Sequence, residues 1–217
     1  CAGELAIDLA GNLVIEEVLS SVTHGLGVVL ALGGSAYLVQ QARGLGWVKM
    51  ASCAIYGLSR IACYGASTLY HSFFLLPPRQ RYVLEVLDHC AIYLLIAGCY
   101  SPFLTFLFHG VKPQWAIALQ ALLWAIAAVG VAFSAGFHGA PAVKTPVEIT
   151  LYLSMGWAIM LCVGDVRAAI DPRGWRGLLH GGIAYTLGVP RFLRGADYGG
   201  VDHGIWHLYV LLGSTHH

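Results

Sequence analysis

Two histidines late in the chain, His203 and His207, have the type and the spacing to bind a metal ion. They lie four residues apart in the stretch DHGIWH, so both occupy one face of a helix and can direct ring nitrogens at one point. His71, in the stretch STLYH, adds a third imidazole, and Asp88 supplies a carboxylate. Three imidazoles beside a carboxylate form the arrangement of a catalytic zinc site, whose fourth position is left for water. The sequence therefore predicts a Zn²⁺ site on His71, His203 and His207, provided that the fold brings them together.

The chemistry of such a site follows from the charge of the ion. Zn²⁺ would lower the pKa of its bound water towards about 7, and Asp88 would accept the proton or orient the water. Ser67, one helical turn before His71, would hydrogen-bond a substrate carbonyl or the developing oxyanion. Glu17 is a candidate for supporting one of the zinc ligands without binding the ion itself. The alternative is that these histidines hydrogen-bond between membrane helices without a metal, with Glu17 as an interfacial group.

Two further histidines receive other interpretations. His24 is interpreted as a polar contact between helices. His89 directly follows Asp88 and is expected to point away from the face of that residue, because neighbouring side chains on a helix diverge.

The amino-acid composition indicates whether the chain folds in water or in a membrane. Of 217 residues, 58% are hydrophobic and only 11% are charged, and the mean hydropathy is +0.70, whereas about a quarter of the residues of a soluble domain are charged. A water-soluble globule is thereby excluded. The net charge of +1, without any block of like charges, argues against nucleic acid as a partner and favours membrane lipids or other membrane proteins.

Long apolar runs, each near the roughly 20 residues that a helix needs to cross a bilayer, predict an all-α fold with a bundle of seven transmembrane helices in one domain, 1–217. The segment before the first run is expected to be a polar approach that becomes an interfacial helix, and Pro190 is expected to interrupt the sixth run. The predicted spans are 18–41, 50–76, 83–108, 114–134, 146–166, 177–193 and 202–217.

The alternating direction of these spans predicts at which membrane face the ionisable residues lie. Odd-numbered helices start at the membrane face where even-numbered helices end, so the polar residues of four helices fall towards one face. Ionisable groups in a membrane are costly and gather in the interior of a bundle, which favours one shared polar site. The residues concerned are Glu16, Glu17, His24, Ser67, His71, Asp88, His89, His203 and His207.

Taken together, these motifs resemble the hemolysin III proteins, the bacterial branch of the progestin and adipoQ receptor family that includes the adiponectin receptors. The resemblance runs along nearly the whole chain, with its short polar motifs in family order. The matching stretches are EEVLSSVTHGLG from Glu16, STLYHS from Ser67, LDHCAIYLLIAGCYSPF from Leu87, LYLSMGW from Leu151, GGIAYTLGV from Gly181 and HGIWHLYVLLGS from His203.

The resemblance implies a seven-helix fold in a bacterial inner membrane, with the amino terminus in the cytoplasm and zinc held at the positions of His71, His203 and His207. Asp88 matches the aspartate that holds the zinc-bound water, and Ser67 matches the serine of the family's SxxxH motif. The wider superfamily includes alkaline ceramidases, so the leading expectation is hydrolysis of a lipid amide such as ceramide. The alternatives are a sensor, receptor or membrane-fluidity regulator in which zinc is structural, and a cytolysin.

Overall fold

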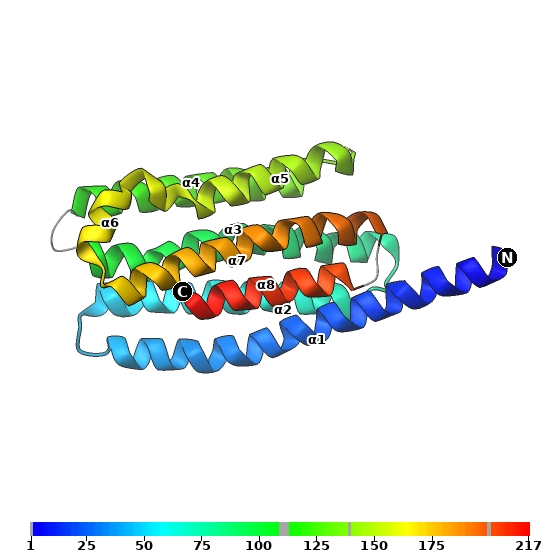
Figure 1. The fold of residues 1–217 in the computed structure, drawn as a ribbon, viewed down its shortest axis with the longest axis horizontal. Coiled ribbons are helices and arrows are strands. Elements are labelled where there is room, and N and C mark those ends of the chain that lie inside the picture. The colour runs from blue at the N-terminus through cyan, green and yellow to red at the C-terminus, as the bar shows by residue number, and fades with distance from the viewer. Residues whose placement is uncertain (1, 109–112, 139, 199–200) are drawn as a thin grey trace.

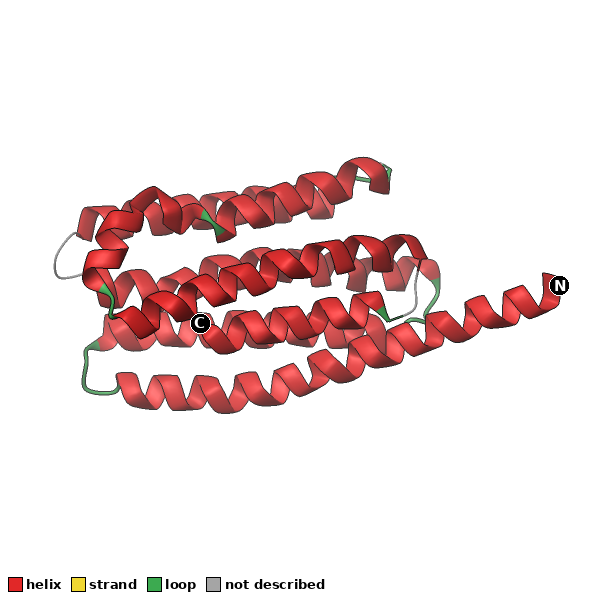
Figure 2. Ribbon diagram, in the orientation of Figure 1, coloured by secondary structure: helices red, strands yellow, loops and turns green. Residues whose placement is uncertain are grey.

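The computed structural model describes residues 2–108, 113–138, 140–198 and 201–217, and nearly all of them are helical (Figures 1 and 2). No strand occurs in these ranges. The helices are α1 (Ala2–Ala42), α2 (Trp47–Ser72), α3 (Pro78–Phe108), α4 (Pro113–Gly136), α5 (Pro141–Gly156), the 3₁₀ segment η1 (Ala158–Cys162), α6 (Val163–Ala169), α7 (Pro172–Tyr198) and α8 (Asp202–His216).

The predicted all-α bundle of seven helices is confirmed, because each apolar run coincides with one helical rod and the fifth rod consists of α5, η1 and α6. Within the described ranges, four helical stretches are long and apolar enough by themselves to cross a membrane. These are Gly11–Ala42, Pro78–Leu107, Gln114–Gly136 and Pro141–Ala169.

Two helices differ from their predicted spans. Helix α1 is continuous from Ala2, so the expected polar approach is already part of the first helix, whose amino-terminal end projects beyond the rest of the bundle (Figure 1). Helix α7 continues through Pro190 to Tyr198, and the expected interruption is wrong. A membrane helix tolerates proline because neighbouring helices and small local adjustments satisfy the freed carbonyl.

The rods pack in a closed order around an interior. Successive helices are in contact from α1 through α5. Helix α5 then contacts α7, α7 contacts α8, and α8 contacts α1. Because α3 also contacts α5 directly, α4 lies outside a ring formed by the other rods. One apolar cluster joins α3, α4 and α5 around Tyr93, Leu123 and Met155. A second joins α1, α2, α3 and α8 around Tyr64 and Val210.

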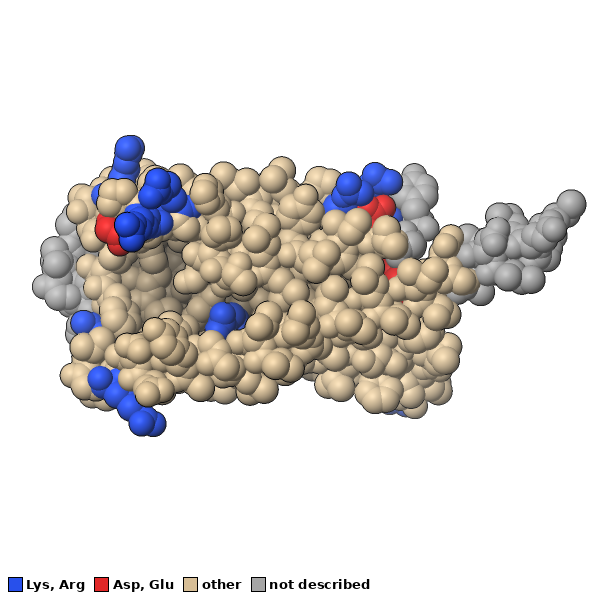
Figure 3. Space-filling view, turned by 60° about the horizontal axis from the view of Figure 1, so that its bottom comes forward, with Lys and Arg blue, Asp and Glu red and all other residues tan. Residues whose placement is uncertain are grey.

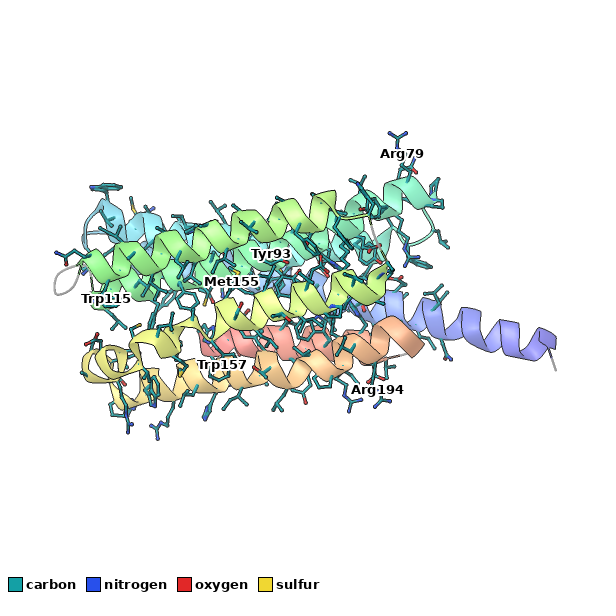
Figure 4. The ribbon with its side chains drawn as sticks, turned by 90° about the horizontal axis from the view of Figure 1, so that it is seen from above. Arg79, Tyr93, Trp115, Met155, Trp157 and Arg194 are labelled. Atoms are coloured by element: carbon teal, nitrogen blue, oxygen red, sulfur yellow. The ribbon has the colours of Figure 1, made fainter. Side chains whose placement is uncertain are left out.

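The outer surface has the character expected in a bilayer. Large apolar side chains such as Leu58, Ile117 and Leu161 are exposed, and Lys and Arg gather mainly towards the two ends of the bundle, with a largely uncharged band between them (Figure 3). Arg79 and Arg194 mark one end and Trp115 the other (Figure 4). Since exposed apolar side chains of this extent suit hydrocarbon and not water, the chain is an integral membrane protein.

Candidate metal centre

The structure brings the three candidate ligands to one point. His71 lies at the end of α2, and His203 and His207 lie one turn apart at the start of α8. The ring centroids are 5.0 Å apart for His71 and His203, 5.0 Å for His71 and His207, and 4.8 Å for His203 and His207. One ring nitrogen from each residue lies within 4.8 Å of the other two. Their convergence is therefore a property of the fold, and their binding of a metal remains a prediction.

Two local features place α8 against its neighbours. Asp202, the first residue of α8, pairs with Arg191 and Arg194 near the end of α7. Gly204 faces Leu19 of α1 so closely that an added Cβ would lie 2.6 Å from the leucine side chain. A residue without a side chain thus lets α8 approach α1 closely, next to His203.

Hydrogen bonds behind two of the rings determine which nitrogens face the centre. Glu17 Oε2 lies 2.6 Å from His71 Nδ1, and Arg81 donates to Glu17 Oε1 at 2.8 Å. A carboxylate only accepts hydrogen bonds, so the proton of neutral His71 lies on Nδ1 and the lone pair on Nε2. In the same way, His207 Nδ1 lies 3.1 Å from the carbonyl oxygen of Ser20. Both contacts turn Nε2 towards the other histidines.

The donor set fits a zinc ion. His71 Nε2 is buried and has no hydrogen-bond partner in the described part of the chain, which is costly for a polar atom unless a ligand satisfies it. Three imidazoles make a common zinc ligand set, and a carboxylate behind a ligating histidine is the usual way to fix its ring. The contact between Glu17 and His71 has this form.

The other two candidate residues share a cavity with the histidines. A hollow of about 120 Å³ in the ring of helices is lined by Ser67 of α2 and Asp88 of α3 together with His203 and His207. Ser67 and Asp88 are both buried, at 1% and 8% exposure. A carboxylate and a hydroxyl therefore line the same space as two of the three candidate ligands, His203 and His207, while their roles remain predictions.

His24 does connect helices, by ring stacking instead of a hydrogen bond. Its ring stacks on that of His207 with centroids 3.6 Å apart and an interplanar angle of 9°. Both nitrogens of His24 are buried without a partner among the residues that the structure describes. His24 also lines the cavity, so it belongs to the polar end of that space, as its depth in the first predicted span indicated.

One pair at the cavity was missed by the sequence analysis. His89 Nδ1 lies 3.0 Å from Glu148 Oε2 of α5, and His89 lines the same cavity as Asp88. His89 was expected to diverge from the face of Asp88, and it contacts α5, but both residues of α3 still line the same cavity. Glu148 stands among apolar residues near the start of a predicted span, and an acidic residue in that setting was a signal for a polar site.

Comparison with known proteins gives matches along most of the chain. The sequence model of the family described as haemolysin-III related matches residues 13–217. The "Hemolysin-3 homolog" of Bacillus subtilis (strain 168) is 33% identical over 205 residues, which cover 92% of this chain and 90% of the relative. The "Hemolysin-3" of Bacillus cereus is 34% identical over 207 residues, covering 94% of this chain and 89% of the relative. The family match includes every residue of the candidate centre.

Proposed function

The chain belongs to the haemolysin-III-related family, and from that membership and the geometry of the centre we propose that it is a zinc-dependent membrane hydrolase of lipid amides. The observation that carries the proposal is the buried, unpartnered Nε2 of His71, fixed by Glu17 and converging with His203 and His207. Asp88 and Ser67 lie in the wall of the adjoining cavity, where they add the groups that hydrolysis needs.

The ion and the side chains would have separate roles in the reaction. Bound zinc would supply a Lewis acid that polarises the carbonyl and brings the pKa of a water ligand towards about 7. The Asp88 carboxylate accepts the proton of the attacking water and passes it to the leaving nitrogen, so that amide and water yield a carboxylic acid and an amine. The Ser67 hydroxyl donates a hydrogen bond to the carbonyl oxygen as negative charge develops there. Glu17 keeps the His71 ring in position.

The substrate class follows from the surroundings of the centre. Most of the cavity wall is apolar, with residues such as Ile92, Leu95, Ile96, Val189 and Val210, which suits an alkyl chain and excludes bulk water. The candidate ligands lie at the end of α2 and the start of α8, towards the end of the bundle that Arg79 and Arg194 mark (Figure 4), where the amide of a lipid would meet its head group. A long-chain acyl amide such as ceramide combines the two kinds of group, polar and apolar, that line this space. The proposal places the protein in a bacterial inner membrane with its amino terminus in the cytoplasm.

The first test compares metal content and lipid cleavage in the same samples. We expect about one zinc per chain in the detergent-purified protein by elemental mass spectrometry, with loss of zinc and of fatty-acid release from ceramide in His71→Ala and His207→Ala. His138→Ala is the matched control, because His138 is exposed and contacts Tyr82 outside the centre. Absence of metal from the wild type would contradict the proposal.

A second outcome would separate the metal from the reaction. If the wild type carries zinc but releases no fatty acid from ceramide or other acyl amides, the hydrolase is wrong and the ion is a structural tie between α2 and α8. In that case removing the metal should lower the thermal unfolding temperature without changing any lipid.

A further inference from the structure

The ring of His207 is held on two sides by α1, a helix that contributes none of the three candidate ligands. The carbonyl oxygen of Ser20 lies 3.1 Å from His207 Nδ1, and the hydroxyl oxygen of Thr23 lies 3.4 Å from the same nitrogen. The face of the ring is covered by His24, whose ring lies parallel to it within 9° at a centroid distance of 3.6 Å. Helix α1 therefore contacts both an edge and a face of this candidate ligand.

His24 is itself held by close packing. Its side chain is buried, and its ring also contacts that of Tyr64 of α2, with centroids 5.1 Å apart and an interplanar angle of 51°. One turn further along α1, Gly27 lies so close to the neighbouring helices that an added Cβ would be 2.8 Å from Leu211 of α8 and 3.0 Å from the Tyr64 ring. The close approach of three helices thus restricts the positions that the His24 ring can take.

A hydrogen bond and a stacked ring restrain different motions of an imidazole. The contact with Ser20 selects the nitrogen of His207 that faces the other histidines, but a ring held at one atom can still tilt about that contact. The lone pair of Nε2 lies in the plane of the ring, so a tilt misdirects it, and tight metal binding needs ligands that are held close to one geometry. A parallel ring 3.6 Å away occupies the space into which His207 would tilt.

The stack also suits a ring that is bound to a cation. Two neutral aromatic rings prefer offset or edge-to-face contacts to full overlap, whereas the centroids of His24 and His207 lie only 3.6 Å apart. Both nitrogens of His24 lack a hydrogen-bond partner within the described ranges, so no carboxylate there holds a second proton on this ring. An imidazole that gives its lone pair to Zn²⁺ becomes electron-poor, and the face of a neutral ring attracts it, as aromatic faces attract cations.

We propose that His24 is a positioning residue of the metal centre. It binds no ion itself, and its ring, packed against Tyr64, fixes the plane of His207 so that Nε2 points at the place where the three histidines converge. This inference rests on the zinc centre of the proposed function and is independent of the reaction proposed there.

The experiment measures zinc affinity and ligand geometry in the whole chain, purified in detergent and stripped of metal. Zinc is titrated against a competing chelator, and Co²⁺ is added to a second sample, because its visible absorption is strongest when its ligands are tetrahedral. We expect His24→Leu to bind zinc about three- to tenfold more weakly, as loss of one aromatic pair would give, and to show a weaker Co²⁺ absorption. His24→Phe keeps a ring and should stay within about twofold of the wild type with an unchanged spectrum.

Two further variants separate the ring from other properties of His24. His24→Gln removes the ring but keeps a polar group at the cavity, and it should lose the same affinity as His24→Leu, including in the case that His24→Leu does not fold. His138→Leu makes the leucine substitution at an exposed histidine and should bind zinc as the wild type does.

The inference is overturned if His24→Leu or His24→Gln binds zinc as tightly as the wild type. It is also overturned if His24→Phe loses as much affinity as His24→Leu, because the ring would then not be the property that matters. Failure of the proposed function gives other results. A wild type that takes up zinc but cleaves no lipid contradicts the hydrolase and leaves the role of His24 intact, whereas a wild type that takes up no metal contradicts both.

Discussion

Glu17 Oε2 lies 2.6 Å from His71 Nδ1, and this contact connects α1 to the last turn of α2 at the point where the three histidines meet. Arg81 of α3 pairs with the other oxygen of the same carboxylate. The orientation of one candidate ligand thus depends on three helices. The carboxylate is almost fully buried, so its charge and its geometry both act on the ring.

Glu17→Gln should weaken zinc binding, because the neutral amide makes the imidazole a poorer ligand and no longer pairs with Arg81. Loss of a carboxylate behind a ligating histidine costs about 10- to 100-fold in metal affinity. Titration of the purified protein against a competing chelator measures this. Glu148→Gln is the matched control, because Glu148 contacts His89 and not a candidate ligand. Equal affinity in Glu17→Gln and the wild type would remove Glu17 from the centre.

Asp88→Asn should retain zinc and lose most of the cleavage of ceramide. The amide keeps the size of the side chain but cannot take a proton from water, and a positioned general base contributes about 10²- to 10⁴-fold. Zinc content and the rate of fatty-acid release are measured on one preparation. Cleavage at the wild-type rate with zinc in place would show that Asp88 is not the base.

Ser67→Ala should lower kcat and leave KM and zinc content nearly unchanged. Its hydroxyl acts only as negative charge develops on the carbonyl oxygen, and removal of one such donor costs about 10²- to 10³-fold in kcat. Thr68→Ala is a useful control, because the neighbouring Thr68 hydroxyl donates to the carbonyl of Tyr64 within its own helix. A rise in KM at constant kcat would assign Ser67 to substrate binding alone.

Gly130→Ala should destabilise the bundle by about 1–3 kcal/mol, as overpacking of a buried contact does. An added Cβ would overlap the ring of Tyr93, a fully buried residue of α3. Gly33→Ala places the same group where no atom lies within 4 Å and should be neutral or slightly stabilising. Thermal unfolding in detergent compares the two. Equal unfolding temperatures would mean that α3 and α4 separate easily.

Asp171, which lies between α6 and α7 at the end of the bundle, should make stability sensitive to acid. The backbone N–H groups of Gly174 and Arg173 donate to Asp171 Oδ1 and hold the pKa of this carboxyl below its usual range. Because the pKa is lower in the folded state, the contribution is present above the pKa of the unfolded chain and is lost as the pH falls through the folded pKa.

The corresponding measurement follows the unfolding temperature from pH 7 down to pH 3. Asp171→Asn keeps a side-chain oxygen for the start of α7 but does not titrate. The wild type should therefore lose more stability than Asp171→Asn over this range. Parallel curves for the two proteins would show that the cap does not depend on the charge.

The sequence predicted the depth of the polar residues better than their direction around each helix. The spacing of His203 and His207 and the count of spans placed these histidines level with His71, and the structure brings all three together. The contact between His89 and Glu148 depends on how α3 and α5 are rotated about their axes, which the order of spans along the chain does not determine. Similarly, hydropathy alone does not reveal that the neighbours of Pro190 allow α7 to continue.

The closed order of the helices bears on how the protein is made. Glu17 and His71 leave the ribosome early, whereas His203 and His207 belong to α8, which follows all the other helices in the chain and packs against both α1 and α7. A growing chain therefore carries only one of the three candidate ligands until α8 enters the membrane. Binding of a metal by all three histidines would then have to wait for correct insertion of α8.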